Sequence, residues 1–157
     1  MHSPRQHGLS LASILAIVVI LVAGAIGYTE IKKRNAREAL AQAITTSTAE
    51  LDKTLGKWND AMTLAGSAPR IGLSGPIASL QAIKQSTSQV PAPDCMAKSK
   101  AHMQQGMQDG IDGMIAFMRN DMPKYDLEEF TSSKIAKMRQ ELQAYEENKT
   151  ACKAHLR

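Results

Sequence analysis

The sequence predicts an all-α protein: an N-terminal transmembrane helix followed by an antiparallel four-helix bundle with one disulfide. Three observations lead to this prediction. A long uncharged segment lies near the start of the chain, apolar residues recur at helical spacing after it, and two cysteines lie equally far from one turn. Aromatic residues make up only 4% of the 157 residues, so the core must be aliphatic. That length allows one domain with a modest core.

The N-terminal segment is long enough to cross a bilayer. Leu9 to Gly27 is a run of 19 residues without charge or proline, and a spanning helix needs about 20 residues. A secretory signal has a shorter apolar region, of about 7–15 residues. We therefore predict that residues 1–8 form a cytoplasmic tail or leader, 9–28 a membrane anchor and 29–157 an extracytoplasmic helical domain.

A cleaved secretory signal is an alternative for the same segment. Arg5 provides the positive charge before the apolar region, and Ala23, Gly24 and Ala25 provide the small residues that signal peptidase requires. Cleavage there would leave a mature chain that starts at Ile26.

A third interpretation comes from a resemblance. The short leader that contains Arg5, then Gly8, Leu9, Ser10 and an apolar helix, resembles the N-terminus of type IV pilins. In that family the leader ends in glycine and the mature chain begins with an apolar residue, as Gly8 and Leu9 do here. The resemblance covers residues 8–28 and implies a pilin-like subunit with a β-sheet after the helix. Ser13 stands where the family has glutamate.

The charges that flank the apolar segment indicate one orientation of the chain in the membrane, and the cysteines indicate the opposite one. Four basic residues, at 32, 33, 34 and 37, follow the segment and only Arg5 precedes it. The positive-inside rule alone would therefore leave the C-terminal domain in the cytoplasm. The cysteines favour the reverse orientation.

Cys95 and Cys152 are placed to form a disulfide. A turn at Pro123 separates two helical patterns, and each cysteine lies 28 or 29 residues from it. If the two helices fold back antiparallel, both cysteines reach the same end. A disulfide across this span would stabilise the fold by about 4 kcal/mol and requires an oxidising compartment. We therefore expect a single-pass inner-membrane protein with a cytoplasmic N-terminus and a periplasmic domain.

Apolar spacing predicts four helices after the anchor, at 29–65, 69–87, 94–121 and 126–154. The second is expected to be broken or kinked by glycines and a proline at 72, 75 and 76. Asp126, with Glu129 three residues later, is expected to cap the fourth. The linkers are short, which favours antiparallel neighbours.

Methionines line one face of the third predicted helix, with Met103 and Met107 at its centre and His102 beside them. Thioethers are soft ligands that suit Cu(I), so these three residues are the candidates for a metal site. The same spacing is what burial of adaptable methionines requires, and we favour a core role.

Three glycines, Gly106, Gly110 and Gly113, recur in the same helix although each costs about 1 kcal/mol relative to alanine. They provide a smooth face either for close packing within the bundle or for a partner. We favour close packing.

Trp58, the only tryptophan, and Arg70 at a helix break could line a ligand or partner pocket, together with Asp60. The alternative is a core tryptophan and a solvated arginine.

Nothing in the sequence indicates an enzyme or a cofactor. It contains no nucleotide-binding, zinc-protease or nucleophile-elbow motif, and its charge of +4 is spread too evenly for a nucleic-acid site. We expect an interaction or structural module of the cell envelope, with a protein partner. The alternatives are a small-ligand or Cu(I)-binding protein and a pilin-like subunit.

Overall fold

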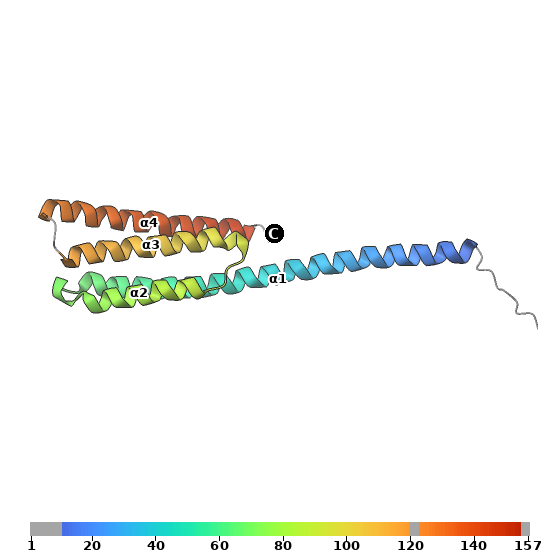
Figure 1. The fold of residues 1–157 in the computed structure, drawn as a ribbon, viewed down its shortest axis with the longest axis horizontal. Helices are drawn as coiled ribbons and strands as arrows, with labels where there is room; N and C mark the ends of the chain where they lie inside the picture. The colour runs from blue at the N-terminus through green and yellow to red at the C-terminus, as the bar shows by residue number, and fades with distance from the viewer. Residues whose placement is uncertain (1–10, 120–122, 155–157) are drawn as a thin grey trace, which may run out of the picture. The chain divides into compact units, whose positions relative to one another are not determined.

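The computed structural model describes residues 11–119 and 123–154, with side chains from residue 28 onward, and all of its regular structure is helical (Figure 1). No strand occurs in these residues, so the fold class is confirmed as all-α, and the β-sheet implied by the pilin resemblance is absent from them. The elements are α1 (Leu11–Ser67), the 3-10 turn η1 (Arg70–Gly72), α2 (Ser74–Gln89), α3 (Asp94–Arg119) and α4 (Lys124–Ala154).

The chain divides into two compact units, and helix α1 contributes to both. The first unit ends at Ala39 and the second runs from Leu40 to Arg157. In the first unit, residues 28–39 are exposed, and surface ion pairs such as that between Arg34 and Glu38, at 3.1 Å, lie along them. The bundle therefore begins about ten residues later than residue 29.

From Tyr28 onward, no helix among the described residues is long and apolar enough to cross a membrane. The anchor predicted over residues 9–28 lies, apart from Tyr28, outside the part whose side chains the structure describes. The same holds for the signal-peptide and pilin-like interpretations of that segment.

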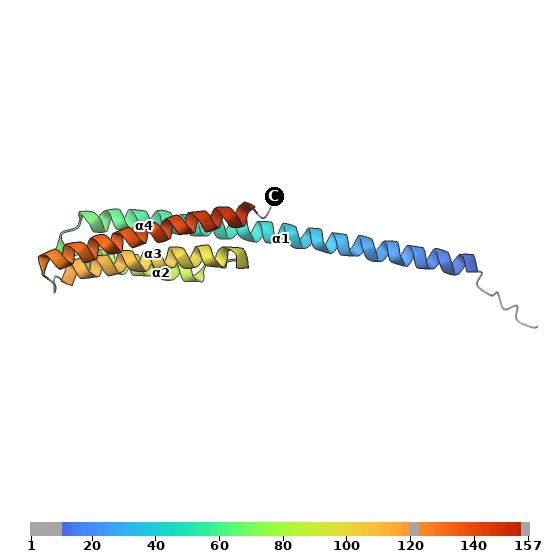
Figure 2. The ribbon, with the colours of Figure 1, turned by 90° about the horizontal axis from the view of Figure 1, so that it is seen from above.

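In the second unit four helical segments lie side by side, as both ribbon views show (Figures 1 and 2). Helices α3 and α4 run in opposite directions and make a more extensive interface than α2 and α3 do. Helix α2 packs on α3, and side-chain hydrogen bonds join α1 to α4. The turn η1, the end of α3 and the start of α4 lie at one end of the bundle, which we call the η1 end.

The core of the bundle is aliphatic and rich in methionine, as its composition predicts. All four helices contribute fully buried side chains, and Trp58 from α1 is the largest of them. Each helix presents these residues at helical spacing, which is why one face of each is buried. The core residues include Ile44, Leu51, Trp58, Leu73, Leu80, Met96, Met103, Met107, Ile111 and Tyr145.

The start of α2 differs from the prediction. The structure places η1 at Arg70–Gly72 and begins α2 at Ser74, so Gly75 and Pro76 lie in its first turn instead of breaking it. The first helical bond reaches Leu73 O from Ile77 N, at 2.9 Å. Because first-turn N–H groups have no partner in the helix, proline is tolerated there without loss of a hydrogen bond.

Helix α4 also begins earlier than predicted. It starts at Lys124, directly after Pro123, whose carbonyl accepts a hydrogen bond from Leu127 N at 3.0 Å. Asp126 therefore lies within the first turn, so the predicted start with Asp126 as cap is wrong. An acidic residue in the first turn still complements the helix dipole.

The disulfide between Cys95 and Cys152 is confirmed, with a Cα–Cα distance of 5.3 Å. It joins the first turn of α3 to the last turn of α4, at the end of the bundle opposite η1. The antiparallel arrangement of α3 and α4 about Pro123 brings the two cysteines together.

Close packing explains the glycines of α3. A Cβ built on Gly106 would lie 3.1 Å from Met138 O, and one on Gly113 would lie 3.3 Å from Lys134 Cβ. Both contacts are with α4. We call this row of Gly106, Gly110 and Gly113 the glycine seam. It lets the α3 backbone approach α4 more closely than any larger residue would allow.

The middle of the seam gives a testable prediction. A Cβ on Gly110 would lie 2.8 Å from Met138 Sδ and 2.9 Å from the Trp58 ring, which is buried and cannot move freely. Overpacking costs about 1–3 kcal/mol and exceeds the gain in helix propensity of about 1 kcal/mol. Gly110→Ala should therefore lower the free energy of unfolding, measured by urea titration with Trp58 fluorescence.

Gly56→Ala is the matched control, because no atom lies within 4 Å of a Cβ at this exposed position in α1. It should raise stability by up to about 1 kcal/mol. If both variants change stability in the same direction, close packing at Gly110 is not the reason for that glycine.

The disulfide gives a second prediction. Replacing both cysteines by serine should lower the free energy of unfolding by about 4 kcal/mol, since the unfolded chain gains the freedom of an open loop. Urea unfolding of the oxidised protein, the reduced protein and the double variant measures the effect. The reduced protein should match the double variant; agreement of the double variant with the oxidised protein would contradict the prediction.

Candidate functional site

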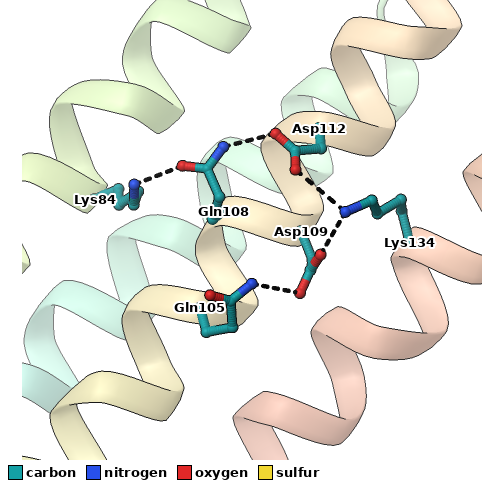
Figure 3. A network of polar contacts seen from close by, with 6 residues as sticks. All are labelled: Lys84, Gln105, Gln108, Asp109, Asp112 and Lys134. Carbon is teal, nitrogen blue, oxygen red and sulfur yellow. Dashed lines mark hydrogen bonds and ion pairs between the residues drawn. The ribbon is translucent and has the colours of Figure 1, made fainter.

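A chain of polar side chains crosses from α2 through α3 to α4 (Figure 3). Lys134 of α4 donates to Asp109 at 2.8 Å and to Asp112 at 3.2 Å. Gln105 donates to the other oxygen of Asp109 at 3.1 Å. Gln108 donates to Asp112 at 2.6 Å and accepts from Lys84 of α2 at 2.5 Å.

Asp109 is the buried centre of this network, with only 4% of the residue exposed. Burial alone would raise the pKa of its carboxyl, but the hydrogen bonds from Lys134 and Gln105 outweigh burial and hold that pKa below its ordinary value. The bond to Asp109 likewise keeps the pKa of Lys134 above its ordinary value. Both groups therefore stay charged at neutral pH, which indicates a structural clamp and not an acid or base.

A second polar cluster joins α1 to α4. The Tyr145 hydroxyl donates to Asp52 at 2.6 Å, and Lys149 donates to the same oxygen at 2.7 Å. Burial, together with the neighbouring carboxylate, raises the pKa of Tyr145 far above its ordinary value. Despite the opposing effect of burial, the bonds from Lys149 and Tyr145 lower the pKa of Asp52. Every polar group is paired here, so this cluster also holds helices together.

The metal-site candidates do not share one environment. Met103 and Met107 are fully buried in the core, and the Thr87 hydroxyl lies 3.5 Å from Met107 Sδ. His102 instead faces α4, where its Nδ1 lies 2.6 Å from a carboxylate oxygen of Glu141. Among the described residues no group of three or more His, Cys, Asp or Glu side chains converges on one point.

A polar groove of about 660 Å³ lies between α2 and α3. Its walls carry five glutamines, and Lys84 is bound there to Gln108. These glutamines do not stand out in the sequence. The residues that line the groove are Gln81, Lys84, Gln85, Ser88, Ala101, Gln104, Gln105, Gln108, Ile111 and Ile115.

A larger and more apolar groove of about 870 Å³ lies along the first half of α4 at the η1 end, and we call it the α4 groove. Helix α4 provides most of its lining, Phe117 comes from α3 and Arg70 from η1. Arg70 lies over the Phe117 ring, 4.8 Å from its centre. The lining residues are Arg70, Phe117, Lys124, Leu127, Glu128, Thr131, Ser132, Ile135, Ala136 and Arg139.

Of the three residues predicted to line a pocket together, Trp58, Asp60 and Arg70, only Arg70 lines the α4 groove. Trp58 is fully buried in the core, where its ring packs against Gly110 and its indole nitrogen has no hydrogen-bond partner among the described residues. Asp60 lies exposed on α1 and lines neither groove.

Arg139 and Thr131 line the α4 groove, but the sequence pattern does not mark either of them as a site residue. Positions 127, 128, 131, 132, 135 and 139 do share one face of a helix, but apolar, hydroxyl and charged residues alternate along it. A search for apolar stripes therefore passes over this face. Only the position of α4 relative to Phe117 and Arg70 shows that it lines a groove.

Searches against protein-family models, curated proteins and solved structures found no match to this chain.

The Asp109 clamp predicts an acid-sensitive stability. Because the folded pKa of Asp109 is lowered, its stabilisation is fully present above the unfolded pKa of about 3.9 and is lost as the pH falls through the folded pKa. Asp109→Asn should therefore lower the free energy of unfolding by about 1–3 kcal/mol at pH 7. The difference from the original protein should shrink below about pH 4.

Urea titrations at pH 7, 5 and 3 measure this difference. Asp60→Asn, at an exposed carboxylate outside the network, is the control and should stay within about 0.5 kcal/mol at each pH. A constant deficit of Asp109→Asn at all three pH values would mean that its charge does not stabilise the fold.

Proposed function

We propose that the protein is a membrane-anchored, extracytoplasmic helical module of the cell envelope that binds a protein partner. The disulfide between Cys95 and Cys152 is the observation that carries this proposal. Structural disulfides persist in oxidising compartments and are rare in the cytosol. The uncharged segment at 9–28 would serve as both export signal and anchor.

The pattern of polar contacts supports a binding role over a catalytic one. The buried carboxylates and lysines lie in paired clamps between helices, as Asp109 and Lys134 do. Among the residues whose side chains are described, neither clamp combines an unpaired acid, base or nucleophile with a groove, and catalysis requires that combination.

Exposed apolar residues at the η1 end support a protein partner. Ile71 in η1 is 95% exposed, Leu64 in the last turns of α1 is 67% exposed, and Tyr125 in the first turn of α4 is 75% exposed. Single exposed apolar residues are common, but three large ones at one end of a small bundle are typical of an interaction surface.

The location can be tested on the full chain expressed in a bacterial host. We expect it to remain in the membrane pellet after carbonate extraction, with an intact mass that begins at Met1 or His2. A thiol-reactive reagent should add to it only after reduction. The Cys95→Ser, Cys152→Ser double variant is the control and should not react at all.

Two results would contradict the location. Two thiols that react without reduction would exclude an oxidising compartment. A chain that begins at Ile26 would replace the anchor with a cleaved signal, and one that begins at Leu9 would replace it with a pilin-like leader.

The partner surface is tested by a photo-crosslinking residue at position 71, which should yield a discrete protein adduct that position 57, on exposed α1, does not.

A further inference from the structure

The α4 groove has the size and shape of a small-molecule site. Its volume of about 870 Å³ lies within the usual range of about 300–1,000 Å³ for ligand pockets. Leu127, Ile135, Ala136 and Phe117 provide apolar surface from two helices. A ligand that fits this surface has an apolar body.

The charges of the groove favour an anion. Three cations, Arg70, Lys124 and Arg139, line it against one carboxylate, Glu128. Lys124 lies 3.9 Å from Glu128 and forms an exposed ion pair with it. The guanidinium groups of Arg70 and Arg139 have no carboxylate partner among the described residues.

Arginine is suited to bind a carboxylate in such a place. Its planar fork of N–H donors matches the two oxygens of a carboxylate, and the charged hydrogen bonds are about twice as strong as neutral ones. The guanidinium carbon of Arg70 lies 4.8 Å from the centre of the Phe117 ring, within the range of a cation–π contact.

We propose that the α4 groove binds a small amphipathic organic anion, whose apolar body packs on Leu127, Ile135 and Phe117 while its carboxylate meets Arg70 or Arg139. A small molecule suits the site better than a flat protein surface, because the groove has the volume of a ligand pocket. The exposed residues Leu64, Ile71 and Tyr125 do not line the groove. This inference does not depend on the proposed anchor or partner.

The test compares three probes that share a phenyl ring on a four-carbon chain and carry an anionic, a neutral and a cationic head group: 4-phenylbutyrate, 4-phenylbutanol and 4-phenylbutylamine. The full chain, in neutral-lipid nanodiscs or in buffer if it is soluble, is titrated with each and followed by NMR of methyl groups. We expect the methyl signals of Ile135 and Leu127 to shift, with the acid binding about tenfold more tightly than the alcohol and the amine most weakly.

Variants locate the anion contact. Arg70→Gln with Arg139→Gln should remove the preference for the acid over the alcohol while leaving Trp58 fluorescence and helicity unchanged. Lys57→Gln removes one positive charge from exposed α1, outside the groove, and should keep the preference.

Several results would overturn the proposal. These are equal affinities for acid and alcohol, an acid preference that survives in the double arginine variant, and shifts confined to methyl groups outside the groove, such as that of buried Ile77 in α2.

Discussion

The close approach of α3 to α4 is the constraint on which the rest of the bundle depends. The glycine seam sets the distance between these helices, and Trp58 from α1 closes over it against Gly110. Each glycine lowers the helix propensity of α3, and this loss is offset by dense packing along the extensive α3–α4 interface. Because the seam excludes side chains, the charged residues that cross this interface must lie at its edges.

The polar contacts follow from that geometry. Lys134 reaches Asp109 beside Gly113, while Tyr145 and Lys149 reach Asp52 on the other side of α4. The pKa values of both aspartates are lowered, so these contacts favour one register between the helices at neutral pH. The carboxylates and lysines of these two clusters thereby align helices, whereas the guanidinium groups of Arg70 and Arg139, which have no carboxylate partner among the described residues, line the α4 groove.

The fold was largely predictable, because it depends on regularities that a linear sequence displays. The equal distances of the cysteines from Pro123, the spacing of Met103 and Met107 and the glycine repeat all follow from helical geometry. The start of α2 was not predictable, since Pro76 reads equally well as a break or as a first-turn residue. The α4 groove was not predictable either, because it arises where α4 meets residues far away in the chain.

The disulfide also limits how far the chain can be extended. The bond between Cys95 and Cys152 closes a loop of 57 positions, so a pull applied on either side of this loop passes through the bond and not along the α3–α4 hairpin. About 200 Å of chain contour, at roughly 3.5 Å per residue, is thereby withheld from extension. Reduction of the bond releases this length.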